Sequence, residues 1–74
     1  MNLRQFEGKS VRLTDDEGEV YEGYAADYIF AEDNEPEEIE ALVLDNLVRK
    51  SDGHRYDDPV EFTATEIRFI EVVD

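Results

Sequence analysis

The segment 7–24 constrains the fold of this chain more than any other stretch of its sequence. Val11 and Leu13 alternate with polar residues, which is the two-residue period of a half-buried β-strand. An acidic run closed by a glycine then predicts a tight turn, and a second strand follows over residues 19–31. Gly23 lies inside that strand and predicts a bend or bulge. We therefore expect a hairpin with a bent second strand, as the start of a strongly curved all-β fold.

The remainder of the chain predicts three further strands and one helical turn. The strands are expected at residues 39–44, 60–62 and 67–73, and the first and last of them carry apolar residues on both faces. Before the hairpin, Leu3 and Phe6 have helical spacing behind the capping residue Asn2, which predicts a single turn that covers one end of the sheet. The pattern does not decide the secondary structure of residues 45–58, because apolar residues at their start are followed by an Asp-Gly turn signal.

Size and composition predict one domain over residues 1–74 that is reinforced by self-association. Hydrophobic residues make up 41% of the chain, with four Tyr and four Phe, which suffices for a core. A domain this small is marginal alone, and with no Cys and one His it lacks the usual disulfide or metal reinforcement. No apolar run is long enough for a signal peptide or a membrane span, so we expect a cytoplasmic protein without membrane contact.

Charge limits the partners of this chain. It has 21 Asp and Glu against 7 Lys and Arg, for a net charge of -14. A field of that sign repels polyanions, so nucleic-acid binding is not expected unless one local patch escapes it. We interpret most of the acids as a solvated surface, and we keep attraction of a basic protein or a cation as the alternative.

No residue set in the sequence predicts catalysis, a cofactor or a specific metal site. The segment 32–38 offers the hard oxygen ligands that Ca²⁺ prefers, but it lacks the spacing and the turn glycine of a calcium loop. His54 lies near several acids but has no second His or Cys to complete a zinc or nucleophilic site. We interpret both features as solvated turns and expect a non-enzymatic protein.

The only concentration of positive charge lies in the segment 49–56. It contains Arg49, Lys50, Arg55 and the aromatic Tyr56, which together are the minimum for phosphate contact and base stacking. Acids within and just after the segment dilute it, so local pairing inside a hairpin loop is the favoured interpretation. A second aromatic group, Tyr24, Tyr28 and Phe30, has the spacing of inward-facing strand positions, and we expect these residues in the core or at the bend of the barrel rather than on a stacking surface.

Five short strands, a bent second strand and a tight turn before the last strand resemble the SH3-like barrels, and most closely the Sm-like (LSm) group. The matching stretches are Leu3 to Phe6, Gly8-Lys9-x-Val11-x-Leu13, the acidic turn to Gly18, Gly23, Asp33-Asn34 and Glu66-Ile-x-x-Ile-Glu-Val72. This resemblance implies a five-stranded SH3-like barrel with a short N-terminal helical turn. It also implies an alternative function, RNA binding, in which Asp33 and Asn34 hold a base and the loop Arg49 to Arg55 is the basic partner. The connection 63–66 contains neither the Arg nor the Gly that Sm-like proteins have there.

The last expected strand also predicts association of copies. Phe69 and Val73 share one of its faces, while Ile70 and Val72 share the other, and one of these faces would be exposed in a monomer. The third expected strand, at residues 39–44, also carries apolar residues on both faces, so one of its faces would likewise be exposed in a monomer. The candidate interface residues are Leu42, Leu44, Phe69, Ile70, Val72 and Val73. We therefore expect a homo-oligomeric binding or assembly module that associates through strand edges, with a basic protein as a further candidate partner.

Overall fold

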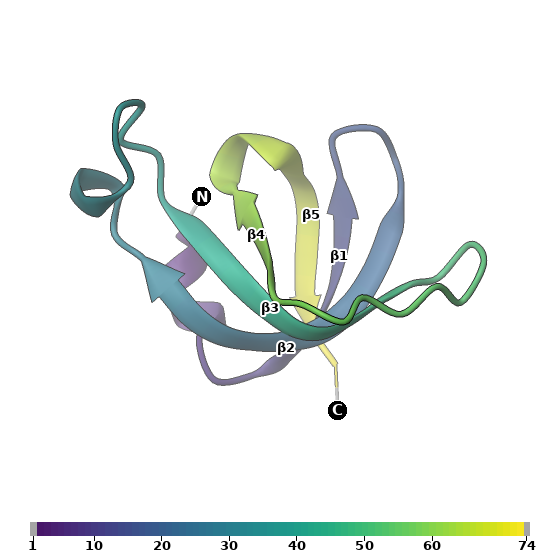
Figure 1. Cartoon of the computed structure of the whole chain (residues 1–74). Helices are drawn as coiled ribbons and strands as arrows, with labels where there is room; N and C mark the ends of the chain where they lie inside the picture. Colours follow the sequence, from purple (N-terminus) through teal and green to yellow (C-terminus); the bar gives the residue numbers. More distant parts are fainter. Residues whose placement is uncertain (1, 74) are drawn as a thin grey trace.

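Five antiparallel strands form a single sheet in the computed structural model, which describes residues 2–73 (Figure 1). The order of the strands across the sheet is β4-β3-β2-β1-β5. The helical segments are short 3₁₀ turns, so the predicted all-β class is confirmed. The strands are β1 (Ser10–Asp15), β2 (Val20–Ile29), β3 (Ala41–Arg49), β4 (Val60–Thr63) and β5 (Ile67–Val72), and the turns are η1 (Leu3–Phe6), η2 (Ala31–Asp33) and η3 (Ala64–Glu66).

The predicted hairpin and the bend of its second strand are both present. Strands β1 and β2 pair with Val11 opposite Gly23, and Gly18 closes the turn with a φ of 87° that favours glycine. The pairing of β2 with β3 shifts register on either side of Tyr24 and Ala25, which bends β2 around the interior (Figure 1). A Cβ built on Gly23 would lie 3.0 Å from the carbonyl oxygen of Asp45, so glycine permits the close approach of β3.

The sheet curls but does not close. Within residues 2–73, strand β4 pairs only with β3 and strand β5 pairs only with β1, so each leaves one edge unpaired. The two edge strands are joined directly by η3, where Thr63 and Glu66 form a reciprocal capping box. The structure therefore shows a strongly curved open sheet, and it does not show the closed barrel that the sequence predicted.

Strand β3 is longer than its sequence pattern indicated. It begins two residues later than expected and continues to Arg49, through part of the segment that the sequence left open. Gly53 then makes the predicted Asp-Gly turn with a φ of 73°. An extended return segment follows, connected to β3 by an isolated bridge between Val48 and Arg55. This hairpin extends beyond the sheet at the right of Figure 1.

The core lies inside the curl of the sheet. Its buried residues are Leu3, Val11, Leu13, Ala25, Leu42, Leu44, Leu47, Phe62 and Ile67. The turn η1 covers this core as predicted: Leu3 is fully buried, and the Asn2 side chain accepts a hydrogen bond from the backbone N–H of Arg4 at 3.2 Å.

Of Tyr24, Tyr28 and Phe30, which were expected in the core or at the bend, only Tyr28 packs against the core, and Tyr24 lies at the bend of β2. Tyr28 is half-buried against the core, but Tyr24 is 43% exposed and Phe30 is 40% exposed. The register shift between Ala25 and Asp27 reverses the alternation, so that Ala25 faces inward before it and Tyr28 after it. Phe30 lies beyond the end of β2, where strand periodicity no longer applies.

Candidate interaction surfaces

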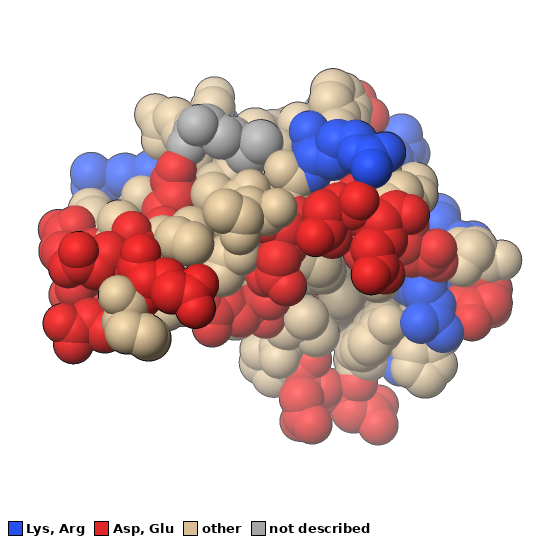
Figure 2. All heavy atoms as spheres, turned by 90° about the horizontal axis from the view of Figure 1, so that it is seen from above, with Lys and Arg blue, Asp and Glu red and all other residues tan. Residues whose placement is uncertain are grey.

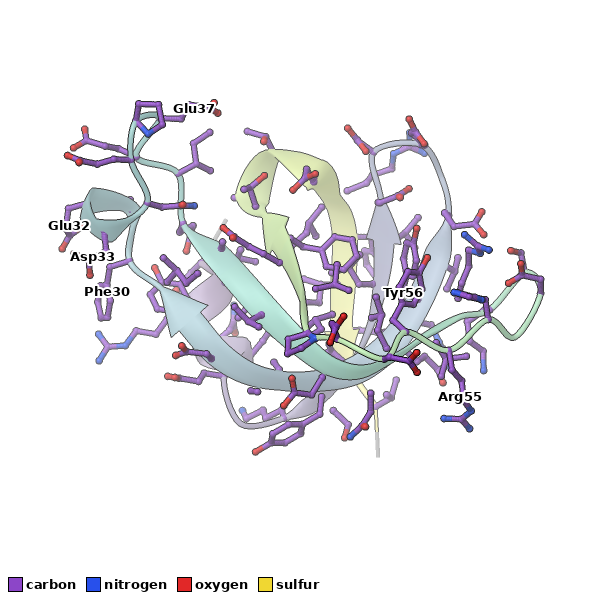
Figure 3. The ribbon with its side chains drawn as sticks, viewed as in Figure 1. Phe30, Glu32, Asp33, Glu37, Arg55 and Tyr56 are labelled. Atoms are coloured by element: carbon purple, nitrogen blue, oxygen red, sulfur yellow. The ribbon has the colours of Figure 1, made fainter. Side chains whose placement is uncertain are left out.

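The two loops that the sequence proposed for RNA binding lie at opposite ends of the molecule. Figure 3 shows Asp33 at the left end, in η2, and Arg55 at the lower right, with Tyr56 nearer the sheet in the segment that follows β3. A base held between Asp33 and Asn34 would therefore not meet the basic segment of the same chain. The structure does not bring these candidate residues together into one site.

The loop between β2 and β3 uses its asparagine internally. The side-chain amide of Asn34 donates to the backbone carbonyl of Ile39 at 2.8 Å and to the Glu61 carboxylate at 3.1 Å. These bonds attach the loop to the residues just before β3 and to β4, and the three residues line a small cavity of about 140 Å³. Asp33 is exposed on η2 beside Asn34. The Asn34 amide donors are thus engaged within the chain rather than presented to a ligand.

The guanidinium of Arg49 is paired with an acid of its own hairpin. Its Nη2 and Nε lie 2.7 Å and 3.1 Å from the two carboxylate oxygens of Asp52, and Nε also lies 3.8 Å from Glu19. The hydrogen bond from Arg49, followed by one from the backbone N–H of His54, lowers the pKa of Asp52 to about 2. The same contact raises the pKa of Arg49. This bidentate pair matches the predicted local pairing within the loop.

The other members of the basic segment are only partly available. Lys50 lies 3.3 Å from Glu22. Tyr56 is half-buried against the core, and its hydroxyl accepts from Arg49 at 3.3 Å. Arg55 is exposed, and in Figure 3 it points away from the sheet; it takes part in none of the ion pairs formed among residues 2–73. The segment therefore presents one cation, Arg55, without an ion-pair partner.

Carboxylates gather mainly over the loops. Figure 2, which looks at the molecule from above, shows them covering the left end and forming a second band across the middle, while basic side chains lie in smaller groups around the rim. The left-end group is the exposed acids of the β2–β3 loop, Glu32, Asp33, Glu35, Glu37 and Glu38. A group of like charges of this kind attracts cations at short range.

The free edge of β5 carries exposed apolar side chains. Phe69 is 55% exposed and Val72 is 44% exposed, whereas Val73 is half-buried just after the strand. Ile70 is also half-buried and packs against the core, opposite Leu13 of β1. The two apolar faces of β5 are therefore unequal, and both contribute exposed apolar atoms near an unpaired strand edge.

Strand β3 does not expose the apolar face that its sequence suggested would be uncovered in a monomer. Leu42 and Leu44 are both 0% exposed and belong to the core. Their neighbours on β2 and β4 pair with them on both sides, and the curl of the sheet encloses their side chains. We therefore do not retain Leu42 and Leu44 as interface residues.

One polar residue that sequence reasoning missed connects three segments. The Glu40 carboxylate accepts hydrogen bonds from the backbone N–H of Leu3 at 3.1 Å and from the hydroxyl of Tyr28 at 2.9 Å. Burial, and then the bond to Glu40, raise the pKa of Tyr28. Nothing in the local sequence distinguishes Glu40 from the acids just before it, because both partners are distant in the chain.

Alkaline pH is expected to destabilise the fold through Tyr21. Burial, and then the neighbouring Tyr56, Asp15 and Glu19, raise the pKa of Tyr21 from 10.0 to about 12. A raised pKa means that folding favours the neutral phenol, so this contribution is complete below pH 10 and is lost as the pH rises from 10 to 12. Urea unfolding at several pH values should show a steeper loss in the wild type than in Tyr21→Phe over that window. Below pH 9 the free energy of unfolding should change with pH equally in the wild type and in Tyr21→Phe. An equal change between pH 10 and 12 would contradict the role given to Tyr21.

Residues 2–73 contain neither a candidate metal site nor a helix that could span a membrane. No group of three or more His, Cys, Asp or Glu in residues 2–73 is arranged to hold a metal ion. None of the helical segments in this part of the chain is long and apolar enough to cross a membrane. Comparison of the chain with protein-family models, with curated proteins and with solved structures found no match in any of the three.

Proposed function

We propose that this chain is a non-enzymatic binding and assembly module of Sm-like type whose copies associate through the free edges of β4 and β5. The observation that carries the proposal is the strand order β4-β3-β2-β1-β5, which leaves two unpaired edges joined by η3. An unpaired edge presents backbone N–H and C=O groups in the spacing that another strand requires. Pairing β4 of one copy with β5 of the next would continue the sheet from copy to copy.

The backbone of β5 supports this mode of association. The N–H of Val73 donates to the carbonyl of Ser10, so it points toward β1. Because N–H direction alternates along a strand, the N–H of Val72 points to the free edge. Phe69 and Val72 would lose exposed apolar surface on pairing. Burial at about 25 cal/mol per Å² over several hundred Å² gives about 10 kcal/mol before entropy and charge repulsion are subtracted.

The oligomeric state tests the proposal. Light scattering at micromolar concentration and moderate salt should give a multiple of the 8.6 kDa chain mass for the wild type. Phe69→Glu should dissociate the assembly, because it places a charge where an apolar ring would be buried between copies. Val72→Pro should weaken association about tenfold, since it removes one edge hydrogen-bond donor while leaving the bond between Val73 and Ser10 intact.

The matched control is Tyr24→Glu, which makes the same change of charge at a similarly exposed aromatic residue on the interior strand β2. It should retain the wild-type mass, and circular dichroism should show all three variants folded. A strictly monomeric wild type would overturn the proposal. Equal dissociation by Tyr24→Glu would attribute the effect to added charge instead of to the edge.

RNA binding is not proposed as a second function, because no observation favours it. Asn34 and Arg49, two of the residues that would carry it, are engaged within the chain. In the same preparation we expect no retention of labelled single-stranded RNA, even at low salt. Retention that falls steeply as salt rises, and that the double change of Arg49 and Arg55 to Glu abolishes, would restore the RNA-binding alternative.

A further inference from the structure

The two edge strands differ in the charge that they carry. The segment 57–63, which contains β4, has three acids and no base. Arg68, on β5, is the only base in the segment 57–73. The acid of β5, Glu71, lies 3.6 Å from Arg12 of the neighbouring strand β1 and is offset by it. The edge of β4 is therefore acidic, whereas the edge of β5 carries a basic residue.

Arg68 is not paired with an acid of its own chain. It is exposed, it takes part in none of the ion pairs among residues 2–73, and its Nη2 donates to the backbone carbonyl of Asp16 at 2.9 Å. Strand β5 advances by two residues between the partners of Thr14 and Asp15, so Arg68 is the extra residue of a bulge. It therefore has no cross-strand partner on β1 that could offset its charge.

On β4, the matching acid is Glu61. Its side chain is exposed, and its Oε2 accepts a hydrogen bond from the Asn34 amide at 3.1 Å, which holds the carboxylate in place. Within the described part of the chain, Glu61 takes part in no ion pair. A second carboxylate lies at the same edge, because Glu66 Oε1 accepts from the backbone N–H of Thr63 at 2.9 Å. A cation that approaches the edge of β4 would meet a carboxylate already in position.

Backbone direction determines which residue of β4 can pair with a partner. The N–H of Ala64 donates to the carbonyl of the residue that precedes β3, so by alternation Thr63 and Glu61 point to the free edge. The N–H of Thr63 is already bound by Glu66, and Pro59 has no N–H. The N–H of Glu61 is thus the donor that β4 offers to another strand.

The same argument selects the opposing residue on β5. The N–H of Val73 points to β1, so Ile70 and Val72 point to the free edge. Antiparallel strands exchange two hydrogen bonds where two such residues lie opposite each other. With Glu61 opposite Ile70, all of β4 lies alongside β5, whereas opposite Val72 the start of β4 would extend past the end of β5. Arg68 is then the diagonal neighbour of Glu61, at a separation that long side chains span.

We propose that Arg68 of one copy forms an ion pair with Glu61 of the next copy and fixes the register of the strand-edge contact, with Glu61 opposite Ile70. The inference rests on the proposed function, for which it names the pair of residues that determines specificity. Pairing of β4 with β5 brings opposite charges together, whereas pairing of β4 with β4 would bring like charges together. Pairing of β5 with β5 would leave Glu61 outside the contact, so the same experiment detects it.

Charge reversal tests the pair, with the dissociation constant of the assembly measured by sedimentation over a range of protein concentrations. Arg68→Glu and Glu61→Arg should each weaken association about tenfold, because each replaces an attraction with a repulsion. The double variant restores opposite charges and should recover to within about threefold of the wild type. Damage to the fold by either change would not be reversed by the other. Absence of recovery would overturn the proposal.

Two control variants make the same changes of net charge away from the strand edges. Arg55→Glu reverses an exposed base on the hairpin after β3, and Asp27→Arg reverses an exposed acid on the interior strand β2. Each should change the dissociation constant less than about threefold. Effects equal to those of Arg68→Glu and Glu61→Arg would attribute the result to net charge and overturn the proposal.

Neutral variants give a second measurement that does not depend on the reversed charges being tolerated by the fold. Arg68→Gln and Glu61→Gln should each weaken association about threefold, and together they should weaken it no more than either alone. Their effect should disappear at 1 M salt, where the Debye length is about 3 Å. Additive effects of the two neutral changes would show that the residues do not interact and would overturn the pair.

The outcomes separate this inference from the proposed function. A wild type that assembles, with no recovery in the double variant, would overturn the ion pair and leave strand-edge association standing. Weakening by Arg68→Glu with no effect of Glu61→Arg would indicate pairing of β5 with β5 and would also overturn it. A strictly monomeric wild type would overturn the proposed function and this inference together.

Discussion

Replacing Leu44 with alanine is expected to lower the free energy of unfolding by about 3 kcal/mol. Leu44 is 0% exposed and lies in the core between β2 and β4, so the shorter side chain leaves a cavity as well as losing apolar burial. A 74-residue domain has about 4 to 11 kcal/mol of stability in total. The variant should therefore unfold at a much lower urea concentration, measured by circular dichroism.

The control for this experiment is Val72→Ala, on the edge strand β5. Val72 is 44% exposed, so at protein concentrations below those at which copies associate the same kind of truncation should cost under about 1 kcal/mol. Because Leu44 belongs to the core of a single chain, its effect should not depend on protein concentration. An effect that appears only at concentrations where copies associate would return Leu44 to the interface.

Replacing Gly23 with valine is expected to cost about 2 kcal/mol by overpacking the bend of β2. The added Cβ would lie 3.0 Å from the carbonyl oxygen of Asp45 and 3.2 Å from a methyl carbon of Leu47. The first of these neighbours is backbone, so relief requires β3 to move away from β2. Thermal unfolding monitored by circular dichroism should show a large decrease in midpoint.

The matched control is Ala26→Val, which adds apolar bulk on the same strand at an exposed position. It should change the midpoint little, because the side chain has room outside the sheet. If Gly23→Val were as stable as Ala26→Val, the close approach of β2 and β3 at Gly23 would not be needed for the fold.

The elements of this fold that local sequence determines were predictable. The alternation around Val11 and Leu13, the turn glycine Gly18 and the bend glycine Gly23 all act over a few residues, and each has the predicted role. The exposure of Tyr24 was not predictable from spacing, because an irregular pairing with β3 changes the phase of β2. Whether β4 meets β5 depends on the curvature of the whole sheet, which no local pattern specifies.

In the candidate sites too, contacts between residues close in the sequence were predictable, whereas contacts between distant residues were not. The pairing of Arg49 with Asp52 spans three residues within one turn, so the sequence indicated it. The engagement of Asn34 by Glu61 and of Tyr28 by Glu40 joins segments that are distant in the chain. Long-range contacts of this kind leave no signature in residue spacing.

The short link between the edge strands has a geometric consequence for any assembly. Because η3 spans three residues, the edges of β4 and β5 diverge from one point, and they are different surfaces. Pairing one with the other is head-to-tail, so it generates a closed ring if the rotation per copy divides a full turn, and an open filament otherwise. The angle between β4 and β5, which the curl of the sheet and the short η3 link determine together, would then set the number of copies. Substitutions in η3 would change the size of the assembly, whereas substitutions along the strand edges would change its affinity.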